Sequence, residues 1–391
     1  MENDIKLAVI GIGAMGSQHV KDIQSMSGVQ LSAICDLRPE RMEAVTSSST
    51  TKSFTDYQDM LNSMELDGVL ISTPHYDHTP IAIDCFHYGI HVLTEKPIAA
   101  QMSDGILMVQ AFKEARKHHS DLKFAIMFQQ RTYGYWKKIK SMLDDGELGK
   151  LIRATWIITN WFRNQSYYDN GDWRATWKGE GGGVLINQCP HNLDLFQWFF
   201  GMPEKVTGFA GFGKYHEIEV EDEVTAFFEY QNGMVGHFIT STAESPGTNR
   251  LEIIGERGKL VFENNILTFW KNKISMLEQI QTSIDPYAFT ESVELDIPYE
   301  HHGLPGHRFI IENFVNVIRG KEELIVRGEE GLNQLQLSNS ILLSSLINKT
   351  ILLPMDSDLF KRELEEKIRN SKVRKEAGIS LIPDISKSFG N

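Results

Sequence analysis

The sequence contains few cysteines, which limits the folds and compartments that suit it. Cys35, Cys85 and Cys189 are the three cysteines among 391 residues. Their small number and wide spacing argue against a disulfide framework or a structural zinc site. We therefore expect a cytoplasmic protein, kept in a reducing environment.

Long hydrophobic runs, a basic leader and an excess of positive charge are also missing. Apolar stretches are interrupted well before the ~20 residues that a membrane-spanning helix needs. The first strand-like segment begins at Ile5, after the acidic residues 1–4, so we predict no signal peptide. Lys and Arg number 39 against 52 Asp and Glu, a net charge of −13. That field opposes nucleic-acid binding, and we expect neither nucleic acid nor membrane as a partner.

The remaining composition is that of a globular chain with a sizeable core, because 41% of the residues are hydrophobic and 23% are charged. At ~100–200 residues per domain, the length suggests two domains. In the first part, short apolar runs alternate with helical patterns, which predicts right-handed βαβ units and a parallel sheet. These runs occupy residues 5–10, 31–35, 68–72, 91–93 and 124–128.

The pattern changes at about residue 148, where strand-like segments follow one another with short turns between them. They occupy residues 151–161, 204–212, 224–230, 234–240, 250–255 and 259–269. This predicts a large, mostly antiparallel sheet, with helices returning at 308–319, 329–348 and 358–373. We expect an α/β protein with domains at 1–129 and 130–391, the second of α+β type.

A glycine-rich turn joins the first predicted strand to the first helix. It consists of Gly11, Ile12, Gly13, Ala14, Met15 and Gly16, and we call it the phosphate turn. The first glycine permits a tight turn, the second lets the backbone approach a pyrophosphate, and the third lets helix and strand pack closely. The helix N-terminus offers free N–H groups and a positive dipole to the anion. The turn therefore predicts a dinucleotide-binding site.

An acidic residue stands where such a site needs one. Asp36 lies 20 residues after Gly16, at the end of the second predicted strand. A carboxylate there accepts hydrogen bonds from ribose hydroxyls and repels a 2′-phosphate, which favours NAD over NADP. Arg38 is equally suited to holding that phosphate and to a solvated place at a helix start. We predict NAD as the cofactor, with NADP as the alternative.

Polar side chains follow the later strands, at the edge where parallel sheets bind their ligands. Glu95 and Lys96 come directly after the fifth strand, and Gln129 follows the sixth. The fourth strand is followed by Ser72, Thr73, Pro74, His75 and, close behind, His78. We predict that all of these residues line the cofactor site.

Together these features resemble the Gfo/Idh/MocA oxidoreductases, the family of glucose–fructose oxidoreductase and inositol dehydrogenase. The matching elements are the phosphate turn, Thr73-Pro74 with His78, Glu95-Lys96-Pro97, and Gly181–Asp194, which we call the glycine-rich segment. The resemblance implies a Rossmann domain followed by a domain with a large open antiparallel sheet. It also implies oxidation of a secondary alcohol of a sugar or cyclitol, or the reverse reduction.

The resemblance also implies roles for particular residues. The family's catalytic lysine and histidine correspond to Lys96 and His191. The intervening position, commonly an aspartate, is Asn187 here, and an amide orients a hydroxyl but does not accept its proton. Trp173 and Arg174 match a pair that contacts the cofactor in some members. Because the family's open sheet often forms subunit contacts, we expect a homo-oligomer, a dimer or tetramer.

The chemistry of alcohol oxidation agrees with these assignments. The hydroxyl must lose a proton, and His191 is the best base because histidine titrates near neutral pH without perturbation. Lys96 places a positive charge beside the developing alkoxide. Asn187 is suited to hold a second hydroxyl and so to select the carbon that reacts.

Three further residues are candidates for substrate contacts: Arg163, Tyr168 and His307. Tyr168 belongs to an aromatic group whose faces suit sugar C–H surfaces and suit a core equally well. The residues near His307 lack the helical spacing of metal ligands, so we predict no metal site there; they are His301, His302, Asp296 and Glu300.

Two other functions fit the same sequence. A protein of this fold can hold NAD tightly and oxidise a sugar transiently, so that a glycosidic bond is eliminated and the product is reduced again. A non-catalytic NAD-binding regulatory protein is suggested by Asn187 in place of the usual acid. The leading prediction is an NAD(P)-dependent sugar or cyclitol dehydrogenase.

Overall fold

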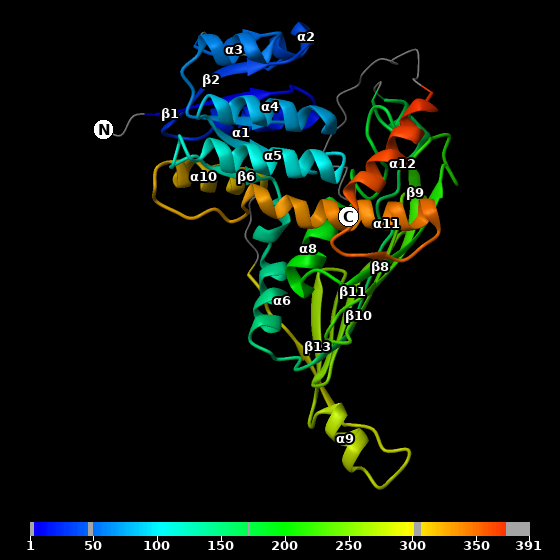
Figure 1. Ribbon diagram of the computed structural model, residues 1–391. Helices are drawn as coiled ribbons and strands as arrows, with labels where there is room; N and C mark the ends of the chain where they lie inside the picture. Colours follow the sequence, from blue (N-terminus) through cyan, green and yellow to red (C-terminus); the bar gives the residue numbers. More distant parts are fainter. Residues whose placement is uncertain (1–3, 46–49, 171–172, 301–305, 373–391) are drawn as a thin grey trace.

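A computed structural model describes residues 4–45, 50–170, 173–300 and 306–372 (Figure 1). His301 and His302, where the residue spacing predicts no metal site, lie outside the described residues. Within the described ranges, no group of three His, Cys, Asp or Glu side chains is arranged to hold a metal ion. None of the helices described is both long and apolar enough to span a membrane.

The first sheet is parallel, as predicted, with the strand order β3-β2-β1-β4-β5-β6. Its strands are β1 (Ile5–Ile10), β2 (Val29–Cys35), β3 (Lys52–Phe54), β4 (Gly68–Ile71), β5 (His91–Thr94) and β6 (Phe124–Ile126). The order reverses between β1 and β4, and the crevice at the carboxyl ends of these strands is where such sheets bind dinucleotides.

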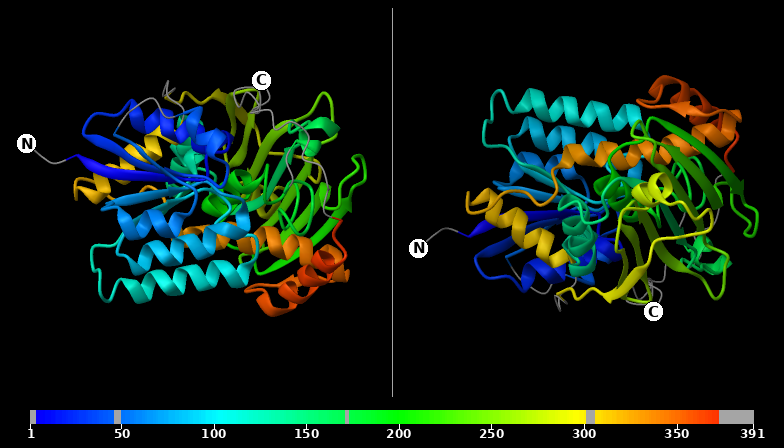
Figure 2. Two further views of the ribbon diagram at one scale, coloured as in Figure 1. Left: turned by 90° about the horizontal axis from the view of Figure 1, so that it is seen from above. Right: turned by 90° about the horizontal axis from the view of Figure 1, so that it is seen from below.

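Helices cover both faces of this sheet (Figure 2). Successive side chains of a strand point to opposite faces, so apolar strands need a cover on each side. Ala8 and Ile10 belong to the core shared with α4 and α5, whereas Leu7 and Val9 pack with α1 and α10. The helices of this region are α1 (Ala14–Gln24), α2 (Pro39–Glu43), α3 (Tyr57–Ser63), α4 (His78–His87), α5 (Met102–Ala115) and α10 (Gly306–Ile318). The chain therefore returns near its end to complete a face of its first sheet.

The second sheet has nine strands in the order β14-β13-β12-β11-β7-β10-β9-β8-β15, and all neighbours are antiparallel except β7 and β10. Its strands are β7 (Leu151–Ile158), β8 (Lys205–Phe212), β9 (Glu221–Glu229), β10 (Val235–Ser241), β11 (Asn249–Gly255), β12 (Gly258–Glu263), β13 (Ile266–Asn272), β14 (Ser292–Asp296) and β15 (Ile351–Leu352). The mostly antiparallel sheet is thus confirmed.

The single strand predicted at 259–269 is wrong, because the segment is a hairpin of β12 and β13. Asn264 and Asn265 form its turn with φ of +52° and +58°. Asparagine tolerates this left-handed backbone better than most residues, and two such residues in a row suit a tight hairpin turn.

The remaining helices all lie in the second part of the chain. They are α6 (Gly134–Asp144), α7 (Gln165–Asp169), α8 (Pro190–Phe200), α9 (Met276–Thr282), α11 (Gly331–Ile347) and α12 (Ser357–Arg369). Helix α11 packs on β8, α8 and α5, so it contacts both halves of the molecule. Helix α9 and the chain around it project from the end of the second sheet (Figure 1).

Candidate functional site

The phosphate turn is shaped for the close approach of an anion. Gly11 has a φ of +89°, and a Cβ on Gly16 would lie 1.8 Å from the carbonyl oxygen of Gly11. A Cβ on Gly13, by contrast, would meet no described atom within 4 Å, so this part of the turn faces open space. Ala14 and Met15 begin α1, whose first N–H groups lie beside that space. These residues fit the phosphates of a dinucleotide.

Asp36 directly follows β2 and is 8% exposed. Its carboxylate accepts hydrogen bonds from the backbone N–H of Ile12 at 2.7 Å and of Arg38 at 2.9 Å. It also forms an ion pair with Arg41 of α2, with 3.5 Å between Nη1 and Oδ2. Sequence reasoning missed Arg41. Its position three residues after Arg38 could have indicated a second arginine near Asp36.

The loops after β4 and β5 are tied together by His78. Its buried ring nitrogens lie 2.8 Å from the carbonyl oxygen of Pro97 and 2.9 Å from that of Thr73. Burial lowers the pKa of this imidazole. The hydroxyls of Ser72 and Thr73 are buried and have no hydrogen-bond partner within the described structure. Buried polar atoms of this kind suit a polar ligand at the strand ends.

Lys96 and Glu95 follow β5 and make different contacts. The ammonium of Lys96 donates a hydrogen bond of 2.8 Å to the backbone carbonyl of Asn187, 91 residues away. Burial lowers the pKa of Lys96, and the charge of Glu95 opposes that shift. Burial by itself raises the pKa of Glu95, but a bond of 2.8 Å to Nε2 of His19 brings it down to about 2. His307 of α10 lies beside His19, and burial lowers its pKa to about 4.

His191 is the second residue of α8 and is 5% exposed. Its Nε2 lies 3.2 Å from the side-chain nitrogen of Gln129, and its Nδ1 is buried without a hydrogen-bond partner among the residues described. Burial, with the charge of Lys96 as the next cause, holds the pKa of His191 well below its usual range. The imidazole is therefore neutral at physiological pH, and a neutral imidazole accepts a proton.

Asn187 is held by a carboxylate that sequence reasoning missed. Its side-chain amide donates to Oε1 of Glu180, and its Oδ1 accepts a hydrogen bond of 3.3 Å from the hydroxyl of Tyr167. Oε2 of Glu180 accepts from the backbone N–H of Ala175 at 2.6 Å. Burial raises the pKa of Glu180, while Arg174 lowers it. The only signal in the sequence was an acid directly before three glycines.

Trp173 and Arg174 contact other residues of this arrangement. The indole of Trp173 contacts the ring of His75, with 5.5 Å between centroids. His75 in turn contacts the backbone carbonyl of Glu180 at 3.1 Å. The guanidinium of Arg174 lies over Trp173 and donates a hydrogen bond of 3.0 Å to the hydroxyl of Tyr167. Both predicted residues are thus beside the predicted His75.

Of the two neighbouring tyrosines in the predicted aromatic group, Tyr167 contacts Asn187. The hydroxyl of Tyr168 donates to Thr242 at 2.8 Å instead, because consecutive residues of α7 face different sides. The guanidinium of Arg163 lies over the ring of Tyr167, 5.1 Å from its centroid. Arg163 is therefore near the candidate site, and Tyr167 lies between it and Asn187.

A buried ion pair fixes the helix that carries His191. Arg131 follows β6 and donates to both carboxylate oxygens of Asp194, at 2.8 and 2.6 Å. It also donates to Glu330 at 2.6 Å. Arg131 and Asp194 are 3% and 1% exposed. A two-pronged arginine–carboxylate pair of this kind constrains both distance and angle, so α8 is locked against the end of the first sheet.

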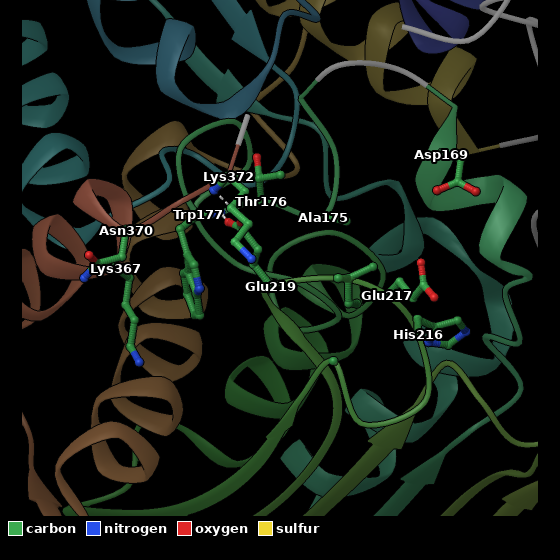
Figure 3. Close-up of a pocket in the computed structure, with 12 residues that line it drawn as sticks. Asp169, Ala175, Thr176, Trp177, His216, Glu217, Glu219, Lys367, Asn370 and Lys372 are labelled. Atoms are coloured by element: carbon green, nitrogen blue, oxygen red, sulfur yellow. Dashed lines mark hydrogen bonds between the residues drawn. The ribbon is translucent and has the colours of Figure 1, made fainter. Parts of the chain in front are cut away.

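A groove with a volume of about 1030 Å³ lies between the end of α12 and the segment 213–219 (Figure 3). Trp177, Glu219 and Lys367 contribute to its walls. Its described lining does not include Lys96 or His191. This groove is therefore separate from the candidate catalytic side chains.

Comparison with known proteins agrees with this geometry. Residues 5–120 match the model of an oxidoreductase family with an NAD-binding Rossmann fold, and residues 136–261 match the GFO/IDH/MocA C-terminal domain. The fold and the site thus define an NAD-binding oxidoreductase. The chain belongs to the Gfo/Idh/MocA family, as the sequence motifs predicted.

Three similar proteins show the range of relatives. Myo-inositol 2-dehydrogenase of Thermotoga maritima is 22% identical over 271 residues, which cover 66% of this chain and 75% of that protein. A glycosyl hydrolase family 109 protein of Shewanella pealeana is 29% identical over 195 residues, 46% of this chain and 41% of that protein. The crystal structure of WlbA dehydrogenase from Bordetella pertussis in complex with NADH and UDP-GlcNAcA matches with a TM-score of 0.76 at 27% identity, over 90% of this chain and 100% of that one.

Proposed function

We propose that the protein is an NAD-dependent dehydrogenase that oxidises a secondary hydroxyl of a sugar or cyclitol, or reduces the corresponding ketone. The observation that carries the proposal is the hydrogen bond by which Lys96 reaches the carbonyl of Asn187, four residues before the buried His191. Lys96 follows β5, His191 lies in the first turn of α8, and the charge of the first acts on the pKa of the second. The names of the inositol and UDP-sugar relatives support the substrate class.

Each residue has a distinct task in this proposal. Bound NAD supplies the acceptor for the hydride of the reacting carbon. The side-chain nitrogen of Gln129 lies 3.2 Å from Nε2 of His191 and holds the ring in place, and the neutral imidazole accepts the hydroxyl proton. The ammonium of Lys96 stabilises the negative charge left on the substrate oxygen. We assign Tyr167 and Asn187 to a neighbouring hydroxyl, and retain Arg163 and His307 as outer contacts.

Cofactor choice rests on the contacts of Asp36. Its carboxylate lies at the end of β2, where the adenosine ribose binds in this fold, and it carries the charge that repels a 2′-phosphate. Arg41 already pairs with that carboxylate. We therefore propose NAD as the preferred cofactor, and place Arg38 and Arg41 as the residues that would accommodate NADP.

The experiment is a rate measurement with the purified full chain. Reduction of NAD or NADP is followed with myo-inositol, glucose and UDP-GlcNAcA, and the reverse reaction with the corresponding ketones. We expect turnover with at least one compound and a higher kcat/KM with NAD. Binding of NADH without turnover across the panel would overturn the proposal and favour a regulatory role.

A glycosidase that uses transient oxidation is the second candidate, and the match to a glycosyl hydrolase family 109 protein favours testing it. Such an enzyme releases the leaving group of a chromogenic glycoside with no net formation of NADH. The dehydrogenase proposal expects no release from that compound.

The outer face of the second sheet is our proposed subunit contact. Phe209 of β8 is 67% exposed there, with half-buried Phe227 of β9 and His237 of β10 packed ring against ring beside it. Exposed apolar side chains on an open sheet are typical of interfaces. Phe209→Glu should lower the mass measured by light scattering from that of an oligomer toward 44.5 kDa, and an unchanged mass would remove this face from consideration.

A further inference from the structure

Asn187 stands at the centre of a hydrogen-bond chain with one direction. Arg174 donates to the hydroxyl of Tyr167 at 3.0 Å, and Gln188 donates to the same oxygen at 3.2 Å. The hydroxyl has one proton, which it donates to Oδ1 of Asn187 at 3.3 Å. The amide nitrogen of Asn187 donates to Glu180. The chain thus begins at donors and ends at a carboxylate.

Glu180 sets this direction because an ionised carboxylate only accepts hydrogen bonds. It is 2% exposed, and its two oxygens accept from the side chain of Asn187 and from the backbone of Ala175. The charged groups that act on it are Lys96 and Arg174, both cations. A carboxylate fixed in this way compels Asn187 to turn its NH₂ group toward Glu180 and its oxygen away from it.

We propose that Glu180 is a positioning residue, which orients Asn187 so that the amide oxygen is presented as the acceptor for a substrate hydroxyl. The inference rests on the proposed dehydrogenase function. It also explains how an amide serves where the resemblance leads one to expect an aspartate. The oxygen of Asn187 makes the hydrogen bond that an aspartate would make. The negative charge that an aspartate would carry is instead on Glu180, which is hydrogen-bonded to Asn187.

The same geometry joins this pair to the reacting end of the site. The backbone carbonyl of Asn187 accepts the hydrogen bond of Lys96, so the residue that receives the hydroxyl also holds the catalytic cation. The pair therefore selects a substrate with two neighbouring hydroxyls, one for Lys96 and His191 and one for Asn187. A vicinal diol is the substrate class that this arrangement recognises.

A double-mutant cycle tests the proposal, with four proteins: wild type, Glu180→Gln, Asn187→Asp and the double variant. Glu180→Gln keeps the shape but lets the side chain donate, so it loses a charge-assisted bond and we expect kcat/KM to fall by about tenfold to a hundredfold. Asn187→Asp places two carboxylates in contact and should lower kcat/KM by a similar factor. The double variant restores one carboxylate and one amide, and should recover most of the activity.

The pH profile supplies a readout that a purely structural role would not move. Two touching carboxylates raise the pKa of one of them, so the Asn187→Asp protein should regain activity relative to wild type as the pH falls and the pair binds one proton. The double variant should follow the wild-type profile. NADH affinity should be the same in all four proteins, because the exchange leaves the phosphate turn intact.

The probes are myo-inositol, UDP-GlcNAcA and, as the compound without a second hydroxyl, cyclohexanol. Additive losses in the double variant, or equal use of cyclohexanol and myo-inositol, would overturn the role of Glu180 while leaving the dehydrogenase proposal in place. No turnover by the wild type, with NADH still bound, would overturn both. The melting temperatures of the same four proteins in saturating NADH provide a second cycle. The double variant should melt close to the wild-type temperature, and additive losses of melting temperature would contradict the pairing of Glu180 with Asn187.

Discussion

The phosphate turn and the glycine-rich segment are both rich in glycine, yet they build their parts of the site by different means. The turn offers backbone atoms, and its tightest approach joins Gly16 to Gly11, close by in the chain. The glycine-rich segment offers side chains and a carbonyl whose partners come from far away, as in the bond of Lys96 to Asn187. A local pattern therefore specifies the first, whereas the second exists only when both halves of the molecule are folded together.

The largest expected effect concerns the pair that joins the two halves. His191→Ala should lower kcat by about 10²–10⁴-fold with little change in NADH affinity, because a positioned base contributes that much. Lys96→Ala should lose a comparable amount, and the double variant should be far from additive because the two residues act on one hydroxyl. Steady-state rates and NADH titration measure these quantities.

Exposed residues of the same types provide the controls. Lys113→Ala and His118→Ala alter exposed side chains of the α5 region and should leave kcat unchanged. Near-normal turnover by the His191 variant would show that another group takes the proton.

A second prediction concerns two glycines of the phosphate turn, Gly13, which leaves space for the phosphates, and Gly16, which packs against the backbone of Gly11. Gly13 has a φ of −78° and open space where a Cβ would be, so Gly13→Ala should fold normally but bind NADH about tenfold or more weakly, since the methyl group enters the space for the phosphates. Gly16→Ala should instead unfold more easily, by about 1–3 kcal/mol, because the methyl group collides with the backbone of Gly11. Thermal unfolding and NADH titration distinguish them. Equal effects of both variants on stability would contradict this division.

Cofactor preference should shift by a smaller factor. Asp36→Ser removes a repulsive charge and frees Arg41 from its ion pair, so the ratio of kcat/KM for NADP to that for NAD should rise by roughly tenfold. If Arg41 binds the 2′-phosphate, as we expect, then adding Arg41→Ala should reverse most of that gain. If adding Arg38→Ala reverses the gain instead, then Arg38 is the residue that binds the phosphate. A wild-type protein that prefers NADP would contradict the role of Asp36.

The smallest change is in the position of the acid limb of the pH profile. Because burial and Lys96 lower the pKa of His191, the neutral, proton-accepting form persists below pH 6.5. Alcohol oxidation should therefore be flat near neutral pH and fall only in more acidic solution. In Lys96→Met the nearby positive charge is gone, so the limb should move to higher pH. A limb that stays in place in this variant would show that Lys96 does not act on His191.

The sequence predicted most of the fold and the backbone part of the site, because these depend on short-range patterns. Strand–turn–helix order and glycine spacing located the phosphate turn, and apolar periodicity located both sheets. It failed at Asn264 and Asn265, where the apolar residues on both sides of the hairpin continue one another without a Gly or Pro between them. A pair of asparagines is a weaker turn signal than Asn-Gly.

The side-chain part of the site was harder to predict, because a residue's partner depends on packing between distant segments. Tyr167 and Tyr168 are neighbours in sequence, and only the turn of α7 decides which one meets Asn187. Nothing in the sequence distinguishes Glu180 from other acidic residues in loops, because its burial beside the amide of Asn187 depends on the fold. The contact of Gln129 with His191 likewise joins residues 62 apart, and no periodicity encodes such a pair.

The return of α10 to the first sheet has a consequence for how the protein is made. Ile310, Ile311 and Phe314 cover Leu7 and Val9, so one face of the sheet that binds the dinucleotide has its cover encoded nearly three hundred residues after its first strand. On the ribosome, β1 and α1 are synthesised early, and the part of that face that α10 covers stays unshielded until α10 has emerged. A nascent chain stopped before residue 306 would therefore leave the part of this apolar face that α10 covers in contact with water.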